Sequence, residues 1–157
     1  MTKLILSGCN GRMGQTITRL CADREDLTIV AGIDPLGSTA GSPYPVFATP
    51  AECGVPAQAL VDFSASAALG SLLAYGKERQ LPLVLASTGY DADQMTQIDT
   101  AAKVIPIFRS ANLSVGVNLL LELTRRAAQV LGEDFDVEIV ERHHNKKLDA
   151  PSGTALM

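Results

Sequence analysis

Residues 4–14, with the sequence LILSGCNGRMG, constrain the fold of this chain more than any other stretch. A short apolar run leads into Gly8, Gly11 and Gly14, spaced G-x-x-G-x-x-G, and a pattern of helical period follows. Glycine is needed where a tight turn leaves a strand, where a pyrophosphate approaches the backbone, and where the next helix packs close to the strand. We therefore predict a strand, a phosphate-binding loop and a helix whose free amides face an anion.

Two features of this loop leave its interpretation open. Asn10 stands where the second glycine of the common G-x-G-x-x-G pattern lies, and Asn enters left-handed conformations readily. A tight turn with a purely structural role would also explain the glycines. A preceding strand, a following acid and a repeated βα unit are needed to favour a dinucleotide site.

The required acid follows at a suitable distance. Residues 27–33 form an apolar run typical of a second strand, and Asp34 comes directly after it, roughly twenty residues beyond the loop. We predict that Asp34 binds the adenosine ribose. The alternative is an acidic turn residue before Pro35, since Asp-Pro pairs commonly start turns.

Further βα units follow along the chain. Apolar runs at 59–63, 83–86 and 104–108 predict strands, with a helix capped by Ser64 and running to about Arg79, and another begun by Asp91 or Asp93. Met13, Ile17, Leu20 and Cys21 predict the helix stripe that packs on the sheet. Strands that are apolar on both faces and alternate with helices predict an α/β fold with a Rossmann-type doubly wound parallel sheet.

Ligands of such sheets bind beyond the carboxyl ends of the strands. Besides the glycine loop, small or polar residues follow predicted strands at 87–89 and 110–114, although plain βα turns would look the same. Residues 117–131 predict a long helix, ended by Gly132 and buried between layers. Alternation at 135–139 then predicts a strand of a half-solvated sheet. We place a dinucleotide-binding domain at 1–132 and the start of a second domain at 133–157.

The stretch 141–155 gathers chemically active side chains. His143, His144, Lys146 and Lys147 precede a helix-opening Pro-Ser-Gly-Thr turn. Proton donors, cations and free amides in one loop suit an anionic substrate that becomes protonated. A solvated loop explains the same residues, and a metal site lacks a further ligand at suitable spacing. We therefore predict no metal.

Composition excludes several classes of protein. The chain of 157 residues is 46% hydrophobic and 19% charged, with a net charge of −4. It offers no basic field for nucleic acid and no apolar run long enough to span a bilayer. Cys9, Cys21 and Cys53 show no spacing typical of disulfides or zinc. Without a secretory signal at the N-terminus, we expect a cytoplasmic protein.

Together these motifs resemble the dihydrodipicolinate reductase family, also named 4-hydroxy-tetrahydrodipicolinate reductases, over the whole chain. The glycine loop with Arg12 and Met13, the segments 87–89 and 111–118, and above all the pattern HHxxKxDAPSGTA at 143–155 carry the resemblance. It implies a Rossmann domain joined to an α+β substrate domain. It also implies reduction of a cyclic dicarboxylate by NADH or NADPH in lysine and diaminopimelate biosynthesis, by a homotetramer.

The resemblance also implies roles for individual residues. His143 would donate the proton, while Lys147 would hold a substrate carboxylate and assist protonation. His144, Gly153 and Thr154 would bind substrate carboxylates. The loops and the resemblance together place the cofactor against Gly8, Gly11, Arg12, Met13, Gly14, Asp34, Ser87, Thr88, Gly89, Ser110, Ala111, Asn112 and Leu113. Leu113 stands where the family often has Phe, a tolerable change in packing.

The last residues of the chain begin a helix, whereas the family continues for about a hundred residues more. A single half-apolar strand and one helical turn cannot bury an apolar face alone. We therefore expect a fragment that binds nucleotide but is itself inactive. Two alternatives stay open: a Rossmann reductase of another small anion, and a nucleotide-binding module without chemistry.

Overall fold

The computed structural model describes residues 1–38, 41–145 and 150–157. Contacts divide the chain into two units, Met1–Arg109 and Ser110–Met157. This division assigns the long helix to the second unit, whereas the sequence analysis placed it in the first. The domain boundary after residue 132 stays a prediction.

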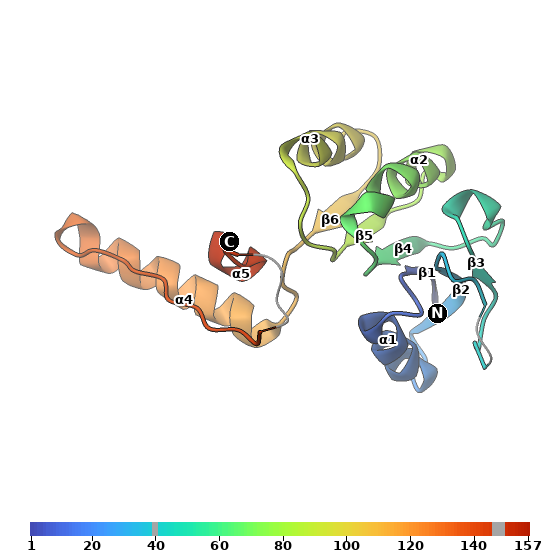
Figure 1. Cartoon of the computed structure of the whole chain (residues 1–157), viewed down its shortest axis with the longest axis horizontal. Coiled ribbons are helices and arrows are strands. Elements are labelled where there is room, and N and C mark those ends of the chain that lie inside the picture. The colour runs from blue at the N-terminus through green and yellow to red at the C-terminus, as the bar shows by residue number, and fades with distance from the viewer. Residues whose placement is uncertain (39–40, 146–149) are drawn as a thin grey trace. The chain divides into compact units, whose positions relative to one another are not determined.

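The first unit is built on a six-stranded sheet with the order β3-β2-β1-β4-β5-β6 (Figure 1). Every pairing is parallel. From β1 the chain builds the sheet first toward β2 and β3 and then, on the other side of β1, toward β4, β5 and β6. The switch point between β1 and β4 is where a doubly wound fold binds its ligands. The predicted fold class is confirmed. The strands are β1 (Thr2–Ser7), β2 (Leu27–Ile33), β3 (Val46–Phe47), β4 (Ala59–Asp62), β5 (Leu83–Leu85) and β6 (Ile107–Arg109).

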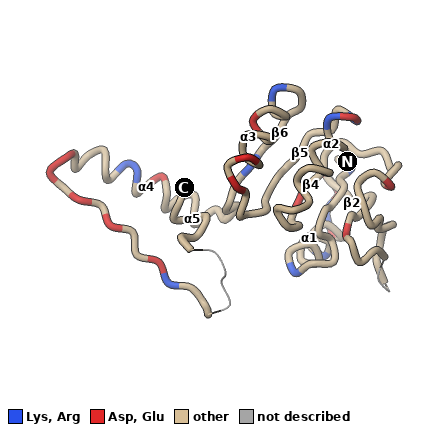
Figure 2. The backbone as a smooth tube through the Cα atoms, turned by 45° about the horizontal axis from the view of Figure 1, so that its top comes forward, with Lys and Arg blue, Asp and Glu red and all other residues tan. Residues whose placement is uncertain are grey.

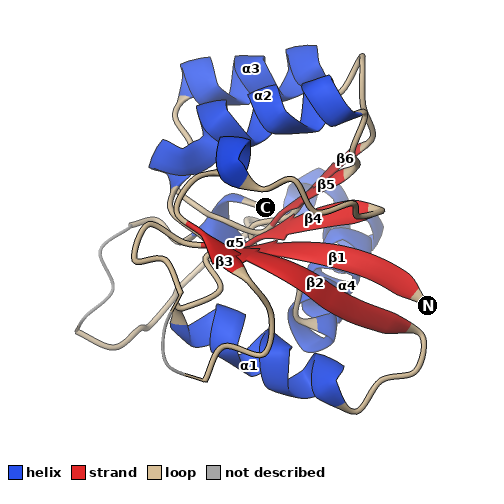
Figure 3. Cartoon of the chain, turned by 90° about the vertical axis from the view of Figure 1, so that its right-hand side faces the viewer, coloured by secondary structure: helices blue, strands red, loops and turns tan. Residues whose placement is uncertain are grey.

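Helices cover both faces of this sheet. Figure 3 shows α1 (Arg12–Ala22) on one face and α2 (Leu69–Arg79) with α3 (Ala92–Ala101) on the other. The 3-10 helices η1 (Pro50–Glu52) and η2 (Ser66–Ala68) lie in the connections. Strand residues and the inner faces of α2 and α3 form the core, which includes Ile5, Ala31, Leu60, Leu72, Leu83, Leu85, Ile98 and Ile105. Burying one such Leu or Ile side chain contributes roughly 1.5–3 kcal/mol.

The apolar stripe predicted for α1 is partly wrong. Met13 is 50% exposed and Leu20 is 67% exposed, whereas Gly14 is buried. Gly14 packs against the loop, and it must be glycine because a Cβ there would overlap with Gly8 O and with the Cα and O of Cys9. The helix therefore approaches the strand at the glycine, and its half-buried face includes Ile17, Thr18 and Cys21 but neither Met13 nor Leu20.

The predicted cap at Ser64 is also wrong. Its hydroxyl donates to Asp62 Oδ1, and Ala65 and Ala68 precede η2 and α2. By contrast, Asp91 caps α3 as one of the two predicted candidates. Its carboxylate accepts from the Gln94 amide at 2.8 Å, and the Gln94 side chain returns a bond to the Asp91 amide. This reciprocal pair is a capping box.

The second unit contains α4 (Val115–Leu131), η3 (Gly132–Asp134) and α5 (Gly153–Leu156). Gly132 ends α4 with a positive φ of 71°, as predicted. The prediction that this helix is buried is wrong for the described residues, since Leu119, Leu120 and Leu123 are each more than half exposed. No helix within the described ranges combines the length and apolar content needed to cross a membrane.

The strand predicted at 135–139 is wrong as well. These residues carry no strand assignment, and Phe135, Val137 and Ile139 are exposed. A strand exists only where its backbone groups pair with a neighbour, and alternation in sequence supplies no neighbour. Figure 2 shows acidic positions recurring along this segment after α4, which matches the alternating polar residues of the sequence.

Candidate functional site

The glycine loop connects β1 to α1 at the carboxyl edge of the sheet. Gly8 has a φ of +73°, and a Cβ there would lie 2.7 Å from the carbonyl carbon of Phe63. The β4 end thus packs directly against the loop. Gly11 has an ordinary φ of −69°, and its Cβ would meet only Gly8 O, at 3.2 Å. Gly11 is exposed, and a side chain there would crowd Gly8 O, so glycine keeps this part of the backbone accessible, as a pyrophosphate site requires.

Asp34 follows β2, and its carboxylate is hydrogen-bonded to the glycine loop. The side chain is buried, with 8% exposed. One oxygen, Oδ2, accepts from the Asn10 amide at 3.1 Å, and Oδ1 accepts from the Leu36 amide at 3.1 Å. Asp34 is thus both the turn residue of one interpretation and a fixed carboxylate of the other. Its two oxygens are oriented at the position where a ribose acid is expected.

Asn10 does not adopt the left-handed conformation that the sequence suggested. Among the described residues, Gln80 is the only non-glycine with a positive φ. The Asn10 side chain instead donates to Gly37 O at 2.9 Å. Asn10, which stands in place of a glycine, thus bonds to the turn after β2 through its side chain.

A buried carboxylate joins the ends of β4 and β5. Asp62 is 0% exposed, and its Oδ2 accepts from the Ser87 hydroxyl at 2.6 Å. Its Oδ1 accepts from the Ser64 amide at 3.0 Å and from the Ser64 hydroxyl. The Ser87 hydroxyl also contacts Ser64 O at 2.9 Å. Since Gly8 packs on Phe63 and Ser64, these contacts connect the glycine loop with the predicted 87–89 segment.

The 87–89 segment ends in a glycine with a positive φ. Gly89 has a φ of +78°, and nothing would lie within 4 Å of a Cβ there. Thr88 is exposed and Ser87 is buried. Burial, followed by the charge of Asp62, raises the pKa of the adjacent Tyr90 hydroxyl to about 12. The Tyr90 hydroxyl is thus protonated and uncharged at neutral pH, near the Asp62 carboxylate.

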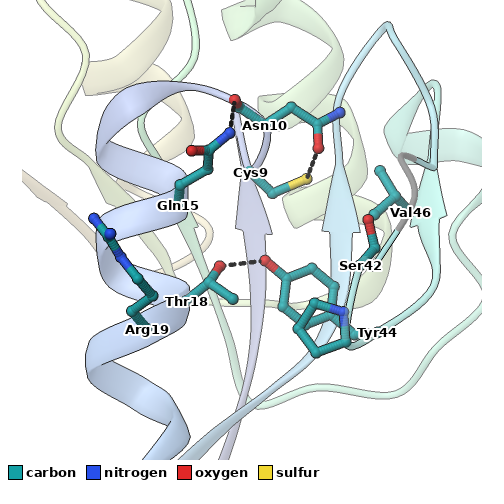
Figure 4. Close-up of a pocket in the computed structure, with 10 residues that line it drawn as sticks. Cys9, Asn10, Gln15, Thr18, Arg19, Ser42, Tyr44 and Val46 are labelled. Atoms are coloured by element: carbon teal, nitrogen blue, oxygen red, sulfur yellow. Dashed lines mark hydrogen bonds between the residues drawn. The ribbon is translucent and has the colours of Figure 1, made fainter.

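A pocket of about 290 Å³ lies behind the glycine loop, between α1 and residues 41–46 (Figure 4). The Thr18 and Tyr44 hydroxyls meet across it at 2.5 Å, and Gln15 contacts Asn10 O at 3.1 Å. Burial, with a contribution from Asp34, raises the pKa of the Cys9 thiol to about 11, so this thiol is a weak nucleophile at neutral pH. None of the predicted cofactor residues lines this pocket.

In the second unit, Glu141 connects His143 to the start of α5. Its Oε2 lies 3.5 Å from His143 Nδ1, and its Oε1 accepts from the Ser152 amide at 2.8 Å. Ser152 caps α5 by accepting from the Ala155 amide at 3.1 Å. A carboxylate beside Nδ1 favours one orientation of the imidazole.

The same unit brings a predicted cofactor segment and a predicted substrate residue together. The Asn112 side chain donates to Thr154 Oγ1 at 2.9 Å. The turn around Asn112 is closed by Ser110, whose hydroxyl donates to Asn112 O at 2.8 Å. Ala111 is half-buried and Leu113 is exposed in this turn. The segment 110–113 and the helix start at 153–154 therefore form one hydrogen-bonded cluster.

The other predicted site residues are Lys147, His144, Arg12 and Met13. Lys147 lies outside the described residues. His144, Arg12 and Met13 are exposed. Within the described ranges, no group of three or more His, Cys, Asp or Glu side chains could hold a metal ion.

Comparison with known proteins gives the family. Residues 2–113 match the model for the N-terminus of dihydrodipicolinate reductase, and residues 116–157 match the model for its C-terminus. The chain belongs to the dihydrodipicolinate reductase family.

Relatives in this family match over the entire chain. The 4-hydroxy-tetrahydrodipicolinate reductase of Clostridium perfringens is 50% identical over 158 residues, covering 100% of this chain and 62% of that protein. The enzyme of Clostridium novyi is 48% identical over 157 residues, again covering 100% and 62%. The chain thus spans about 62% of the length of these relatives.

Solved structures agree with the fold. The dipicolinate-bound dihydrodipicolinate reductase from Paenisporosarcina sp. TG-14 matches with a TM-score of 0.79 and 26% identity, covering 99% of this chain and 63% of that one. An oxidoreductase from Agrobacterium radiobacter in complex with NAD⁺, L-tartaric acid and magnesium matches with a TM-score of 0.59 and 15% identity. It covers 81% of this chain and 41% of that one, and it supports the fold alone.

Sequence reasoning missed three residues with positions in these clusters: Asn10, Asp62 and Glu141. Glu141 stands two residues before His143, a spacing that would have suggested a contact in an extended segment. Asp62 ends an apolar strand at the ligand-binding edge, which is a similar signal to that of Asp34. The side-chain bond of Asn10 to Gly37 had no signal, because it spans 27 residues.

Proposed function

We propose that this protein is a 4-hydroxy-tetrahydrodipicolinate reductase, which reduces a cyclic dicarboxylate with NADH or NADPH on the route to diaminopimelate and lysine. The observation that carries the proposal is the pairing of an open glycine loop with Asp34 at the switch point of the sheet. The family membership supports this substrate class. Residues 1–132 would form the dinucleotide-binding domain and residues 133–157 would begin the substrate domain.

The cofactor would lie along the carboxyl edge of the sheet. The pyrophosphate would face Gly11 and the first amides of α1, where Gly8 and Gly14 give the loop its shape and Arg12 and Met13 begin the helix. Asp34 would accept from the ribose hydroxyls. When bound, the nicotinamide supplies the hydride. Residues 87–89, supported by Asp62, and residues 110–113 would line the rest of the cofactor.

The substrate would meet the second unit. Hydride addition to an imine-like ring leaves a centre that needs a proton, and His143 would supply it. Glu141 would hold the imidazole through Nδ1, so that Nε2 is the donating atom. Lys147, His144 and the start of α5 at Gly153 and Thr154 would bind the carboxylates. Asn112 supports this arrangement by fixing the Thr154 hydroxyl.

A turnover assay tests the proposal. The purified protein, extended to the length of its relatives, should oxidise NADH in the presence of freshly formed dihydrodipicolinate. Oxo acids without the ring serve as control substrates. Equal turnover of an open-chain oxo acid would indicate a different reductase, and nucleotide binding without any turnover would indicate a binding module.

We further propose that NADH binds at least as tightly as NADPH. A 2′-phosphate would lie beside the Asp34 carboxylate, and Pro35, Leu36, Gly37 and Ser38 supply no cation. Two unit charges about 4 Å apart repel by roughly 1 kcal/mol in water and roughly 4 kcal/mol near a protein surface. Fluorescence titration with each nucleotide measures the preference. Tighter binding of NADPH by more than about tenfold, roughly 1.4 kcal/mol, would mean that Arg12 outweighs Asp34.

We propose two further properties, of which the first rests on the resemblance to the family. We propose a homotetramer, which light scattering on the extended protein would measure, and a location in the cytoplasm, which fractionation of cells would test. Tetramer formation also bears on the exposed leucines of α4, which a larger assembly would have room to bury.

A further inference from the structure

One contact in the first unit that the proposed cofactor site does not explain is the side-chain hydrogen bond of Asn10. Its Nδ2 donates to Gly37 O at 2.9 Å, while its backbone amide donates to Asp34 Oδ2 at 3.1 Å. One residue of the glycine loop therefore holds both ends of the turn 34–37. The turn is closed by its own bond from the Gly37 amide to Asp34 O at 2.8 Å.

We propose that Asn10 is a specificity-determining positioning residue, which holds the turn 34–37 against the glycine loop and thereby sets the discrimination between NADH and NADPH. The inference rests on the proposed function, because it assumes that Asp34 faces the adenosine ribose. It concerns a residue that would touch neither the hydride nor the ribose through its side chain, and that acts through Asp34 and Gly37.

The physical basis is that NADH and NADPH require different positions of the turn 34–37. The ribose of NADH carries hydroxyls that can donate to a carboxylate already oriented by two amides. A 2′-phosphate carries negative charge and bulk at the same place, so Asp34 or the turn must move aside to admit it. The bond to Gly37 resists that movement. Removing the bond from Asn10 to Gly37 should therefore weaken NADH binding, because Asp34 is less well oriented, and should allow the turn to move aside for NADPH.

The backbone makes Asn10 a clean position to substitute. Its φ is not in the left-handed region, so a residue with Cβ fits without strain. Asn10→Ala removes the amide, and Asn10→Leu keeps the branched shape of the side chain without its donor. Gln15→Ala is the matched control, since Gln15 Nε2 also bonds to this loop, at Asn10 O and 3.1 Å, but does not contact the turn.

The first experiment compares dissociation constants for NADH and NADPH by fluorescence titration. In Asn10→Ala and Asn10→Leu, the preference for NADH over NADPH should fall about fivefold, the effect of one net hydrogen bond. In Gln15→Ala the preference should stay within about twofold of wild type. An unchanged preference in both Asn10 variants overturns the inference. An equal change in the control overturns it too, because any loosening of the loop would then suffice.

The second experiment needs no nucleotide. Amide hydrogen exchange should accelerate about fivefold at Leu36 and Gly37 in the Asn10 variants and stay unchanged in Gln15→Ala. Unchanged exchange at both amides contradicts the clamp. If wild-type protein binds neither NADH nor NADPH, the proposed function fails, and this exchange measurement still decides whether Asn10 holds the turn.

Discussion

At the scale of single residues, the three loop glycines have different reasons to be glycine. Gly8 combines a positive φ with backbone atoms of Phe63 and Ser64 within 2.8 Å of an added Cβ. Gly14 would place its Cβ against Gly8 and Cys9. Gly11 has an ordinary φ, and its Cβ would make one close contact, at 3.2 Å from Gly8 O. Packing therefore requires glycine most strongly at positions 8 and 14, and we propose that Gly11 serves a ligand.

This difference predicts opposite outcomes for two substitutions. Gly11→Val should weaken NADH binding by at least about tenfold, because its methyl groups occupy the approach of the pyrophosphate. Its cost in unfolding free energy should be about 1 kcal/mol, since Val caps a helix poorly. Gly8→Ala should instead cost at least about 2 kcal/mol of unfolding free energy through strain and overlap.

Calorimetric titration with NADH and urea unfolding measure both quantities. The assignment of Gly11 would be refuted by unchanged NADH affinity in a folded Gly11→Val protein. A Gly8→Ala protein as stable as wild type would contradict the close packing of the loop on the β4 end.

At the scale of secondary-structure elements, a helix cap depends on neighbouring residues, whereas a strand depends on a partner elsewhere in the chain. Asp91 and Gln94 form the capping box of α3, and Gln94 Nε2 also donates to Ser66 O at 2.8 Å. The start of α3 is thereby tied to η2, which precedes α2. The residues 135–139, by contrast, have the alternation of a strand without a described neighbour to pair with.

The cap gives a prediction with an internal control. Asp91→Ala should lower the unfolding free energy by about 1 kcal/mol, because the Gln94 amide loses its acceptor. Asp93→Ala, two residues further on in the first turn, should cost about 0.3–0.5 kcal/mol, the size of a favourable interaction with the helix dipole. Urea unfolding of the two variants gives the comparison. Equal losses would mean that charge near the helix start, rather than the cap, carries the effect.

At the scale of the whole molecule, the two predicted halves of the site belong to different units. The glycine loop, Asp34 and the 87–89 segment lie in Met1–Arg109, while His143, Thr154 and the 110–113 segment lie in Ser110–Met157. Each half is organised internally by its own buried or bridging carboxylate, Asp62 in one and Glu141 in the other. Nucleotide binding and proton donation should therefore be separable by mutation.

In the extended enzyme, we expect His143→Gln to lower the turnover number by roughly 100-fold, the usual contribution of a general acid, with little change in NADH affinity. Lys147→Ala should weaken both substrate binding and turnover, because it removes the cation that we propose binds a substrate carboxylate. Steady-state kinetics with NADH titrations measure these effects, and Gly11→Val is the control with the reverse pattern. Wild-type activity in the His143→Gln, Lys147→Ala double variant would remove both residues from the mechanism.

Much of the first unit could be predicted because its signals are local. Apolar runs that alternate with helical patterns indicated the parallel sheet, and the capping residue Asp91 was among the predicted helix starts. The errors share one cause. Met13 and Leu20 are exposed, Ser64 bonds to Asp62 and 135–139 forms no strand, and each of these outcomes depends on what lies opposite in space. Residue patterns report which face is apolar, but not what covers that face.

The sequence by itself determined the class of fold, the glycine loop and the acid after β2, because strand runs, positive-φ glycines and strand-end acids are properties of a few neighbouring residues. Only the tertiary structure decided how these groups work together. In sequence Asn10 looked like a tolerated replacement for glycine, whereas in the structure its side chain bonds to the turn 34–37. It also placed Glu141 between His143 and Ser152. The physical reason is that a hydrogen bond depends on distance and direction in space, and residues that meet across 27 positions of chain leave no periodicity to detect.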